Sequence, residues 1–417
     1  MRKNRKKDGK RVVVAMSGGV DSSVVAKMLV EAGYEVIGMH LFLWSDPACS
    51  IQRENKCCST AALLDAREVA NKLGIPFYVI DVSKEFKKDV VDYFLEEYSA
   101  GRTPNPCVVC NRRIKFGIML KKARELGATF LATGHYVRIN TNDELRMTNQ
   151  LSNLKLKEQN AKLQFKIQNY KLLRGIDHAK DQSYMLAMVR AEDLKYAMFP
   201  LGEMTKVEVR LLAKKWKLPV AGKRESQEIC FVGDPDYRDF LKRYIPSKIK
   251  PGKIVDHKGN VIGKHLGLPL YTVGQRKGLE TSVRAYKSRS HSDRGSSTKS
   301  GRTSVQRETK PMYVVGMDVG KNLLIVGEEK DLYKKEMVVE KVNVISDEFR
   351  VSSFEFLKNI SVQIRYHHKA VPCSVEICTG STSTIKVKFK KPERAITPGQ
   401  FAVFYRGDEV LGGGTIR

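Results

Sequence analysis

The sequence predicts an α/β fold in its N-terminal half and a β-barrel at its C-terminus. From residue 11 to residue 133, short apolar runs alternate with segments of helical spacing. This alternation is typical of a parallel sheet that helices cover on both faces. From Met312 to the end, strand-like runs are separated by turn residues, which indicates a small antiparallel barrel. Helices fade beyond about residue 222, so we expect a small central domain between the two.

The elements of the N-terminal half follow one another in order. The expected strands are 11–16, 36–44, 77–80 and 129–133, and the expected helices are 22–32, 61–73, 86–98 and 116–126. Glycine follows three of these helices, at Gly33, Gly74 and Gly127, where a left-handed residue ends a helix at little cost. Residues 181–216 also have helical spacing.

Two stretches interrupt the pattern. Residues 139–170 are rich in Asn, Gln and Lys, and we expect an inserted hairpin or ordered arm there. Residues 284–310 hold eight basic residues, two acidic residues and seven serines, too little apolar surface to offset the entropy of ordering. The expected domains are a catalytic domain over 1–222, a central domain over 223–283, the basic serine-rich insertion over 284–310 and the barrel over 311–417.

The charge balance indicates a polyanionic partner. The chain has 74 Lys and Arg against 46 Asp and Glu, a formal net charge of +28. A basic surface gains affinity for nucleic acid because binding releases counterions from the phosphates. No apolar run approaches the roughly 20 residues that span a bilayer, and the basic start lacks the apolar stretch of a signal peptide. We therefore expect a soluble, cytoplasmic protein without a membrane partner.

The strongest motif is Ser17–Ser22, SGGVDS, between the first strand and the first helix. Its two glycines allow the backbone to approach a phosphate, and the helix N-terminus favours an anion. Asp21 beside phosphates suggests a role in holding Mg²⁺ or in capping the helix. The motif lacks the Gly-Lys-Ser/Thr ending of a Walker A loop and resembles the loop of the PP-loop ATP pyrophosphatases, which adenylylate a substrate oxygen. Met39 and Gly134 are expected at the carboxyl edge of the same sheet, where ligands bind in open α/β folds.

A second motif, TPNPCVVCN over residues 103–111, places Cys107 and Cys110 two residues apart. Its two prolines predict an extended, stiff loop. A thiol nucleophile, half of a metal site and incidental cysteines are all compatible with this spacing. A metal site needs further ligands, and the adjacent Cys57 and Cys58 lack a standard gap. Three cationic residues follow Cys110 directly, and nearby cations favour the reactive thiolate.

Cys230 lies among charged residues and is expected to lead into an apolar strand. By itself it is more typical of a core cysteine than of a catalytic one. We expect structural or local roles for the remaining cysteines, and no disulfide framework in a chain without a secretion signal. These remaining cysteines are Cys49, Cys57, Cys58, Cys373 and Cys378.

Several blocks occur together in one order along the chain. They are SGGVDS, TPNPCVVCN, ATGHY, KDQSY, FPLG, ESQEICFVG, YTVGQRKGL and TPGQFAVFY. The ordered set resembles the bacterial tRNA 2-thiouridylase (MnmA) family over nearly the whole chain apart from the two insertions. The resemblance implies a PP-loop (adenine nucleotide α-hydrolase-like) domain, a small central domain and a C-terminal barrel that helps to hold tRNA.

The resemblance also implies roles for particular residues. Cys110 would be the nucleophile, Cys230 would carry a persulfide, and the two can pair as a disulfide. Asn105, Pro106 and Cys107 would face the target base, and some members have Asp where this chain has Cys107, which leaves the proton-transfer residue unassigned. The implied ATP contacts are Ala15, Met16, Ser17, Gly18, Gly19, Val20, Asp21, Ser22, Met39 and Gly134. The implied tRNA contacts are His135, Lys180, Asp181, Gln182, Arg365, Tyr366 and Gln400.

The implied activity is ATP-dependent 2-thiolation of the wobble uridine of tRNA. It requires ATP, Mg²⁺ and a persulfide donor protein, such as a cysteine desulfurase or a sulfur relay, and no metal held directly by protein ligands. One alternative is a cluster-dependent tRNA thiolase that binds iron through Cys107, Cys110 and a third cysteine. Another is a different PP-loop ligase, which would need neither Cys110 with Cys230 nor a basic chain. A third is an RNA-binding module with a degenerate ATP site, against which the intact Ser17–Ser22 loop argues.

Overall fold

The computed structural model describes residues 10–47, 60–141, 170–225, 229–233, 236–279, 311–346, 349, 357–377 and 384–417. The serine-rich insertion, most of the excursion expected at 139–170, and Cys49, Cys57, Cys58 and Cys378 lie outside these residues. Within the described part of the chain, no helix is both long and apolar enough to cross a membrane.

The N-terminal domain is built on a five-stranded parallel sheet in the order β3-β2-β1-β4-β7. Its strands are β1 (Arg11–Ala15), β2 (Glu35–Phe42), β3 (Phe77–Asp81), β4 (Phe130–Ala132) and β7 (Ala197–Met198). Neighbouring residues of β1 point to opposite faces, because Val12 and Val14 enter one hydrophobic core whereas Val13 enters another. The prediction of a parallel sheet covered on both faces is therefore confirmed.

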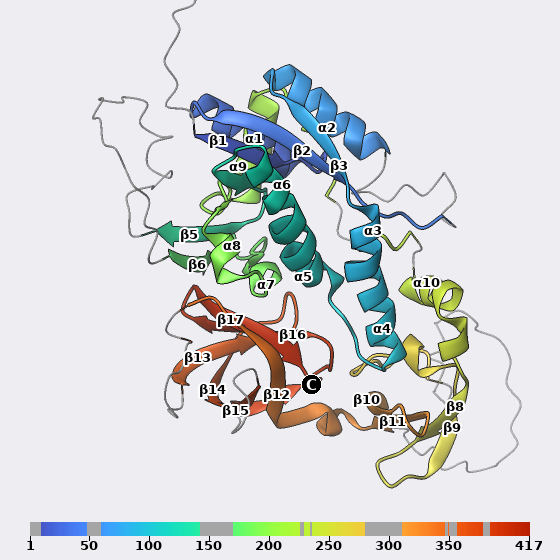
Figure 1. Ribbon diagram of the computed structural model, residues 1–417. Helices are drawn as coiled ribbons and strands as arrows, with labels where there is room; N and C mark the ends of the chain where they lie inside the picture. The colour runs from blue at the N-terminus through green and yellow to red at the C-terminus, as the bar shows by residue number, and fades with distance from the viewer. Residues whose placement is uncertain are drawn as a thin grey trace, which may run out of the picture.

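Helices cover both faces of this sheet (Figure 1). Helices α1 (Val20–Glu31), α2 (Thr60–Leu73) and α9 (Lys206–Lys215) enclose the core that contains Val12 and Val14. Two longer helical rods enclose the other core. One rod consists of α3 (Ser83–Phe86), the π-helical segment η1 (Lys87–Asp92) and α4 (Tyr93–Ser99), and the other of α5 (Pro106–Cys110), the π-helical η2 (Asn111–Met119) and α6 (Leu120–Glu125).

Two expectations about helices were wrong. The TPNPC segment is not extended throughout, because α5 begins at Pro106, where the missing amide costs nothing, and the Asn105 side chain accepts from the Val108 amide at 3.4 Å. Residues 181–216 are not one helical region: α7 (Ser183–Leu186) and α8 (Ala191–Leu194) are single turns before β7. Close packing outweighs the helical pattern at Gly202. The backbone there lies so near Val137 that a Cβ would overlap the Val137 carbonyl.

The central domain contains a four-stranded sheet in the order β10-β11-β8-β9. Its strands are β8 (Gly252–Val255), β9 (Val261–His265), β10 (Tyr313–Asp318) and β11 (Leu323–Gly327), and helix α10 (Tyr237–Tyr244) with the 3-10 turns η3 (Pro246–Lys248) and η4 (Leu268–Leu270) accompanies them. We expected β10 and β11 to belong to the C-terminal barrel. They leave it because β11 pairs in parallel with β8, a partner some 70 residues earlier in the chain.

The C-terminal barrel has six strands in the order β12-β15-β14-β13-β16-β17, and it closes because β12 also pairs with β17. The strands are β12 (Tyr333–Val344), β13 (Leu357–Gln363), β14 (Val371–Ile377), β15 (Ile385–Arg394), β16 (Phe401–Arg406) and β17 (Glu409–Ile416), preceded by the 3-10 turn η5 (Glu329–Leu332). The N-terminal chain contributes a hairpin, β5 (Val137–Thr141) and β6 (Tyr170–Arg174), whose second strand pairs with β17. This hairpin connects the barrel to the N-terminal domain (Figure 1).

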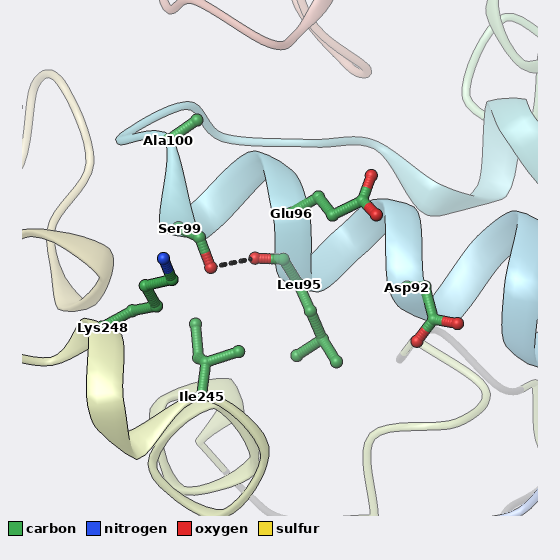
Figure 2. A pocket seen from close by; sticks show the side chains of 7 residues that line it. All are labelled: Asp92, Leu95, Glu96, Ser99, Ala100, Ile245 and Lys248. Atoms are coloured by element: carbon green, nitrogen blue, oxygen red, sulfur yellow. Dashed lines mark hydrogen bonds between the residues drawn. The ribbon is translucent and has the colours of Figure 1, made fainter.

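A groove of about 420 Å³ lies between α4 and the α10–η3 segment. Figure 2 shows its lining, which is Asp92, Leu95, Glu96, Ser99, Ala100, Ile245 and Lys248. None of the residues that the sequence assigns to ATP, sulfur or tRNA lines this groove.

Candidate active site

The loop after β1 begins at a fixed point of the sheet. Ala15 ends β1, and the Met16 amide donates to the Met39 carbonyl at 2.8 Å. The side chain of Met39 is fully buried within β2, three residues before the strand ends. Met39 therefore anchors the loop through its backbone, level with the last residue of β1, and its expected contact with ATP stays a prediction. Val20, also buried, begins α1.

The turn itself exposes backbone amides at an open helix N-terminus. Gly18 has φ +71°, and a Cβ there would lie 2.9 Å from the Cα of Ala62 on α2, so the position requires glycine. Gly19 is the N-cap of α1 and has no side chain to cap the first-turn amides. The hydroxyls of Ser22 and Ser23 donate to the Gly19 carbonyl at 3.2 and 2.8 Å. The amides and the helix dipole together suit this turn to a phosphate.

Asp21 lies in the first turn of α1 and is held by two side chains. The Tyr136 hydroxyl donates to its Oδ1 at 2.8 Å, and Lys206 Nζ contacts its two carboxylate oxygens at 2.7 and 2.8 Å. A Cβ on Gly134 would lie 2.9 Å from the Cβ of Asp21, so the end of β4 can approach α1 only with glycine there. The expected carboxyl-edge position of Gly134 therefore agrees with the structure. Burial, together with the neighbouring Asp21 carboxylate, raises the pKa of Tyr136, which stays a neutral donor.

Lysines that the sequence analysis did not single out surround this loop. Lys206 begins α9 after a capping box of Thr205 and Glu208, a sequence signal that places its backbone but not its ammonium group. Lys223 Nζ donates to the Gly18 carbonyl at 3.0 Å and also pairs with Asp65 of α2. Both ammonium groups lie where they can offset the charge of bound phosphates.

The two cysteines of the CxxC motif lie on one short helix. Cys107 is exposed near the start of α5, and Cys110 is half-buried at its end, after the buried Val108 and Val109. The residue that follows α5 fixes the helix in place, because the Asn111 side chain donates to the Met185 carbonyl at 3.1 Å. The thiols are therefore presented on a rigid element.

Cys230 lies in a turn and not at the start of the strand that the sequence indicated. Its neighbour Phe231 is 1 % exposed and packs edge-on against Phe86 and Phe94, with ring centroids 5.8 and 5.3 Å apart. These aromatic contacts stabilise a turn where apolar residues alone indicated a strand. Cys230 and Cys110 both pack against the hydrophobic core that contains Phe231.

A loop of the barrel holds the chain that leads into α5. Gln400 Nε2 donates to the carbonyls of Thr103 and Pro104 at 2.9 and 3.2 Å, and the Thr103 amide donates to the Pro398 carbonyl at 2.8 Å. The Gln400 amide thus fixes the segment just before Asn105, and its expected contact with tRNA stays a prediction. The barrel thus helps to position the cysteine helix.

The KDQSY segment is also internally engaged. Asp181 accepts from Arg174 Nη1 at 2.9 Å, from the Gly175 amide at 3.1 Å and from both the amide and the hydroxyl of Ser183. Lys180 Nζ pairs with Glu225 at 2.7 Å. The Gln182 side chain accepts from the backbone amide of the residue after His135 at 3.1 Å. These three side chains thus contact the β6 hairpin strand, Glu225 and Tyr136, and their expected contacts with tRNA stay a prediction.

Arg365 and Tyr366 lie half-buried in the turn that follows β13. Burial raises the pKa of Tyr366, and the nearby Asp181 and Cys107 raise it further. Its ring also lies 5.9 Å from that of Tyr184. The barrel therefore brings Tyr366 beside the exposed thiol that we expect to face the target base.

His135 is a packing residue in this structure. Its side chain is 8 % exposed, its ring lies 6.3 and 6.2 Å from those of Phe116 and Phe199, and its Nδ1 pairs with Thr133 Oγ1 at 2.7 Å. Burial lowers the pKa of His135 well below 6.5, and the charge of Lys115 lowers it further. The expected contact of this side chain with tRNA stays a prediction.

The buried neutral imidazole makes stability depend on pH. Below about pH 6.5 the unfolded chain protonates His135 while the folded protein does not, so the free energy of unfolding falls as the pH drops. Between about pH 6.5 and 5, we expect the free energy of unfolding of wild type to fall by up to about 1.4 kcal/mol per pH unit more than that of His135→Phe. Urea unfolding of both proteins across this range measures the difference. Parallel curves would contradict a buried neutral histidine.

Comparison with known proteins decides the family. A family model described as the tRNA methyl transferase HUP domain matches residues 10–234, more than half of the chain. A PRC-barrel model of the same series matches residues 238–291, and an aminomethyltransferase β-barrel model matches residues 334–416. The tRNA-specific 2-thiouridylase MnmA 1 of Caldanaerobacter subterraneus subsp. tengcongensis is 44 % identical over 407 residues, 97 % of each chain. The chain belongs to the MnmA family of tRNA-specific 2-thiouridylases.

A second MnmA relative, from Carboxydothermus hydrogenoformans, is also 44 % identical and covers 98 % of this chain and 97 % of its own length. Among solved structures, a 4-thiouridine synthetase in complex with RNA and ATP is 14 % identical with a TM-score of 0.30, covering 57 % of this chain and 51 % of the synthetase. A likeness at that level supports no inference about function.

Proposed function

We propose that this chain uses ATP to replace the C2 oxygen of a tRNA wobble uridine with sulfur, forming 2-thiouridine, AMP and pyrophosphate. The observation that carries the proposal is the combination in one enzyme of a glycine turn open to phosphate with cysteines on α5 and in the Cys230 turn. MnmA relatives that match the chain almost end to end are named tRNA-specific 2-thiouridylases. The family models are named for methyl transfer, but a methyltransferase requires neither an ATP turn nor a thiol pair.

The chemistry balances in three steps. The uridine C2 oxygen attacks the α-phosphate of ATP, and pyrophosphate leaves, because an oxygen bonded to AMP is a better leaving group than a carbonyl oxygen. The terminal sulfur of a Cys230 persulfide attacks C2 and displaces AMP. The Cys110 thiolate then attacks Sγ of Cys230, which releases 2-thiouridine and leaves a Cys110–Cys230 disulfide. A dithiol reductant restores both thiols.

The residues around the PP-loop fit ATP. Gly18 and Gly19 leave room for phosphate beside the α1 amides, and Lys206 and Lys223 lie within reach of the departing pyrophosphate. Among the described residues, no cluster of three His, Cys, Asp or Glu side chains can hold a metal ion by itself. We therefore propose that Asp21 would contact a Mg²⁺ ion carried by the phosphates, and that this ion would supply positive charge to offset theirs.

The proposed partners follow from the same chemistry. A wobble uridine lies in a single-stranded loop, and the basic chain with net charge +28 suits the phosphates of tRNA. A persulfide on Cys230 must come from a donor protein with a persulfide of its own, such as a cysteine desulfurase or a sulfur relay. Thiols that must be reduced after each turnover suit a reducing compartment, so we propose that the enzyme works in the cytoplasm.

The test is a single-turnover reaction of unmodified tRNA with ATP, Mg²⁺ and a persulfide donor. Nucleoside mass spectrometry is expected to find one 2-thiouridine for each AMP released, and none when ATP is omitted. Thiolation that requires bound iron would instead favour the cluster-dependent alternative, and thiolation without AMP release would contradict adenylylation.

A further inference from the structure

A chain of ion pairs connects Asp21 of the PP-loop through Lys206 to Glu225. Lys206 Nζ lies 2.7 Å from Oδ1 of Asp21 and 2.8 Å from Oε1 of Glu225, so one ammonium group bridges two carboxylates. Glu225 lies five residues before Cys230 and also receives Lys180 at 2.7 Å. The Lys206 side chain is 10 % exposed. At this burial a shared charge is screened little by solvent, unlike that of a surface pair.

Lys223 makes a second contact with the loop. Lys223, two residues before Glu225, donates to the Gly18 carbonyl at 3.0 Å and pairs with Asp65. Burial by itself would raise the pKa of Glu225, but the hydrogen bonds from Lys180 and Lys206 outweigh it and lower the pKa to about 2. Glu225 is therefore a carboxylate at every working pH, and its charge is always available to the link.

We infer that Lys206 and Glu225 are positioning residues that couple the binding of nucleotide at the PP-loop to the accessibility of Cys230. The inference rests on the proposed function. Without nucleotide, Lys206 holds Glu225 beside the loop, and Lys223 holds the Gly18 carbonyl. The phosphates of ATP, placed beside Asp21 and Gly18, compete with Glu225 and the Gly18 carbonyl for these two ammonium groups. Binding thus releases Lys223 and Glu225 from the loop, and Cys230 becomes available for sulfur transfer only once ATP is present.

The first measurement is the rate at which iodoacetamide alkylates Cys230, followed by peptide mass spectrometry on the full chain without tRNA. The probe is an ATP analogue with a methylene bridge between the α- and β-phosphates. In wild type, saturating analogue is expected to raise the rate at least about fivefold, the lower end of typical coupling between sites. In Glu225→Gln the rate is expected to be high already and to respond little to the analogue.

Coupling between two sites is reciprocal, so Glu225→Gln is also expected to bind the analogue more tightly than wild type. The gain in affinity should be about the factor by which the analogue raises the alkylation rate of wild type. Lys206→Arg should retain the response, and Lys206→Met should lose it. The matched control is Glu31→Gln, which removes a carboxylate from an exposed ion pair with Lys27 on the same helix as Asp21. It should respond as wild type does.

Equilibrium dialysis of the analogue separates the two levels of inference. Failure of wild type to bind the analogue would count against ATP use and so against the proposed function. Tight binding with an unchanged Cys230 rate in wild type would overturn the link while leaving the function intact. A wild-type response in Glu225→Gln would overturn it equally, and a merely structural role for Glu225 would lower thermal stability without abolishing the response.

Discussion

Cys110→Ser and Cys230→Ser are each expected to lower the rate of 2-thiouridine formation at least about 1,000-fold, because a serine hydroxyl can neither carry a persulfide nor attack one. The two variants should fail at different steps. Cys230→Ser cannot accept sulfur, so tRNA stays unmodified and unattached. Cys110→Ser can still transfer the persulfide, so tRNA should accumulate as a covalent adduct on Cys230 that a thiol reductant releases.

Cys373→Ser is the matched control. Cys373 is 3 % exposed in the barrel core, and burial raises its pKa to about 12, so it is an inert thiol. Its replacement should lower stability by about 1 to 2 kcal/mol without changing the thiolation rate of the folded protein. Denaturing gels of radiolabelled tRNA detect the adduct, and mass spectrometry quantifies 2-thiouridine. Normal thiolation by Cys110→Ser, with no adduct at any time, would show that the bound sulfide leaves by external reduction instead.

The parts of the fold that local patterns control were predictable from the sequence. Gly33 and Gly74 end helices at φ +85° and +65°, because glycine is the residue that takes this conformation without strain. Long-range pairing set the rest. Nothing in the local pattern of β10 and β11 tells the barrel from the central sheet, and the partner of β11 is β8, far earlier in the chain. Apolar alternation identifies a strand but not its neighbour.

The candidate site divides in a similar way. The Ser17–Ser22 turn lies where a strand meets a helix, so its position followed from the sequence. The bridge from Asp21 through Lys206 to Glu225 joins residues up to about 200 positions apart, and no spacing rule connects them. Asn105 is different, because an Asn before Pro is a helix-start signal, and that signal could have corrected the expectation of an extended loop.

Gly18→Ala is expected to lower ATP-dependent AMP release and thiolation at least about 100-fold, because a loop displaced by about 1 Å misplaces the phosphates. The added Cβ would lie against the backbone of Ala62, which is part of α2 and cannot move aside as a side-chain tip can. Gly18 also has φ +71°, so alanine adds backbone strain at the same position. The turn must therefore open or shift away from α2.

Gly33→Ala separates the strain from the clash. Gly33 has φ +85°, and a Cβ there would meet nothing within 4 Å, so this variant carries the conformational cost alone, about 1 kcal/mol. We expect it to lose a few degrees of melting temperature and to retain wild-type AMP release and thiolation. Equal loss of activity in the two variants would mean that overall stability limits catalysis. Wild-type AMP release by a folded Gly18→Ala would mean that ATP does not bind at this turn, because the close packing of Gly18 on α2 would then have no bearing on the phosphates.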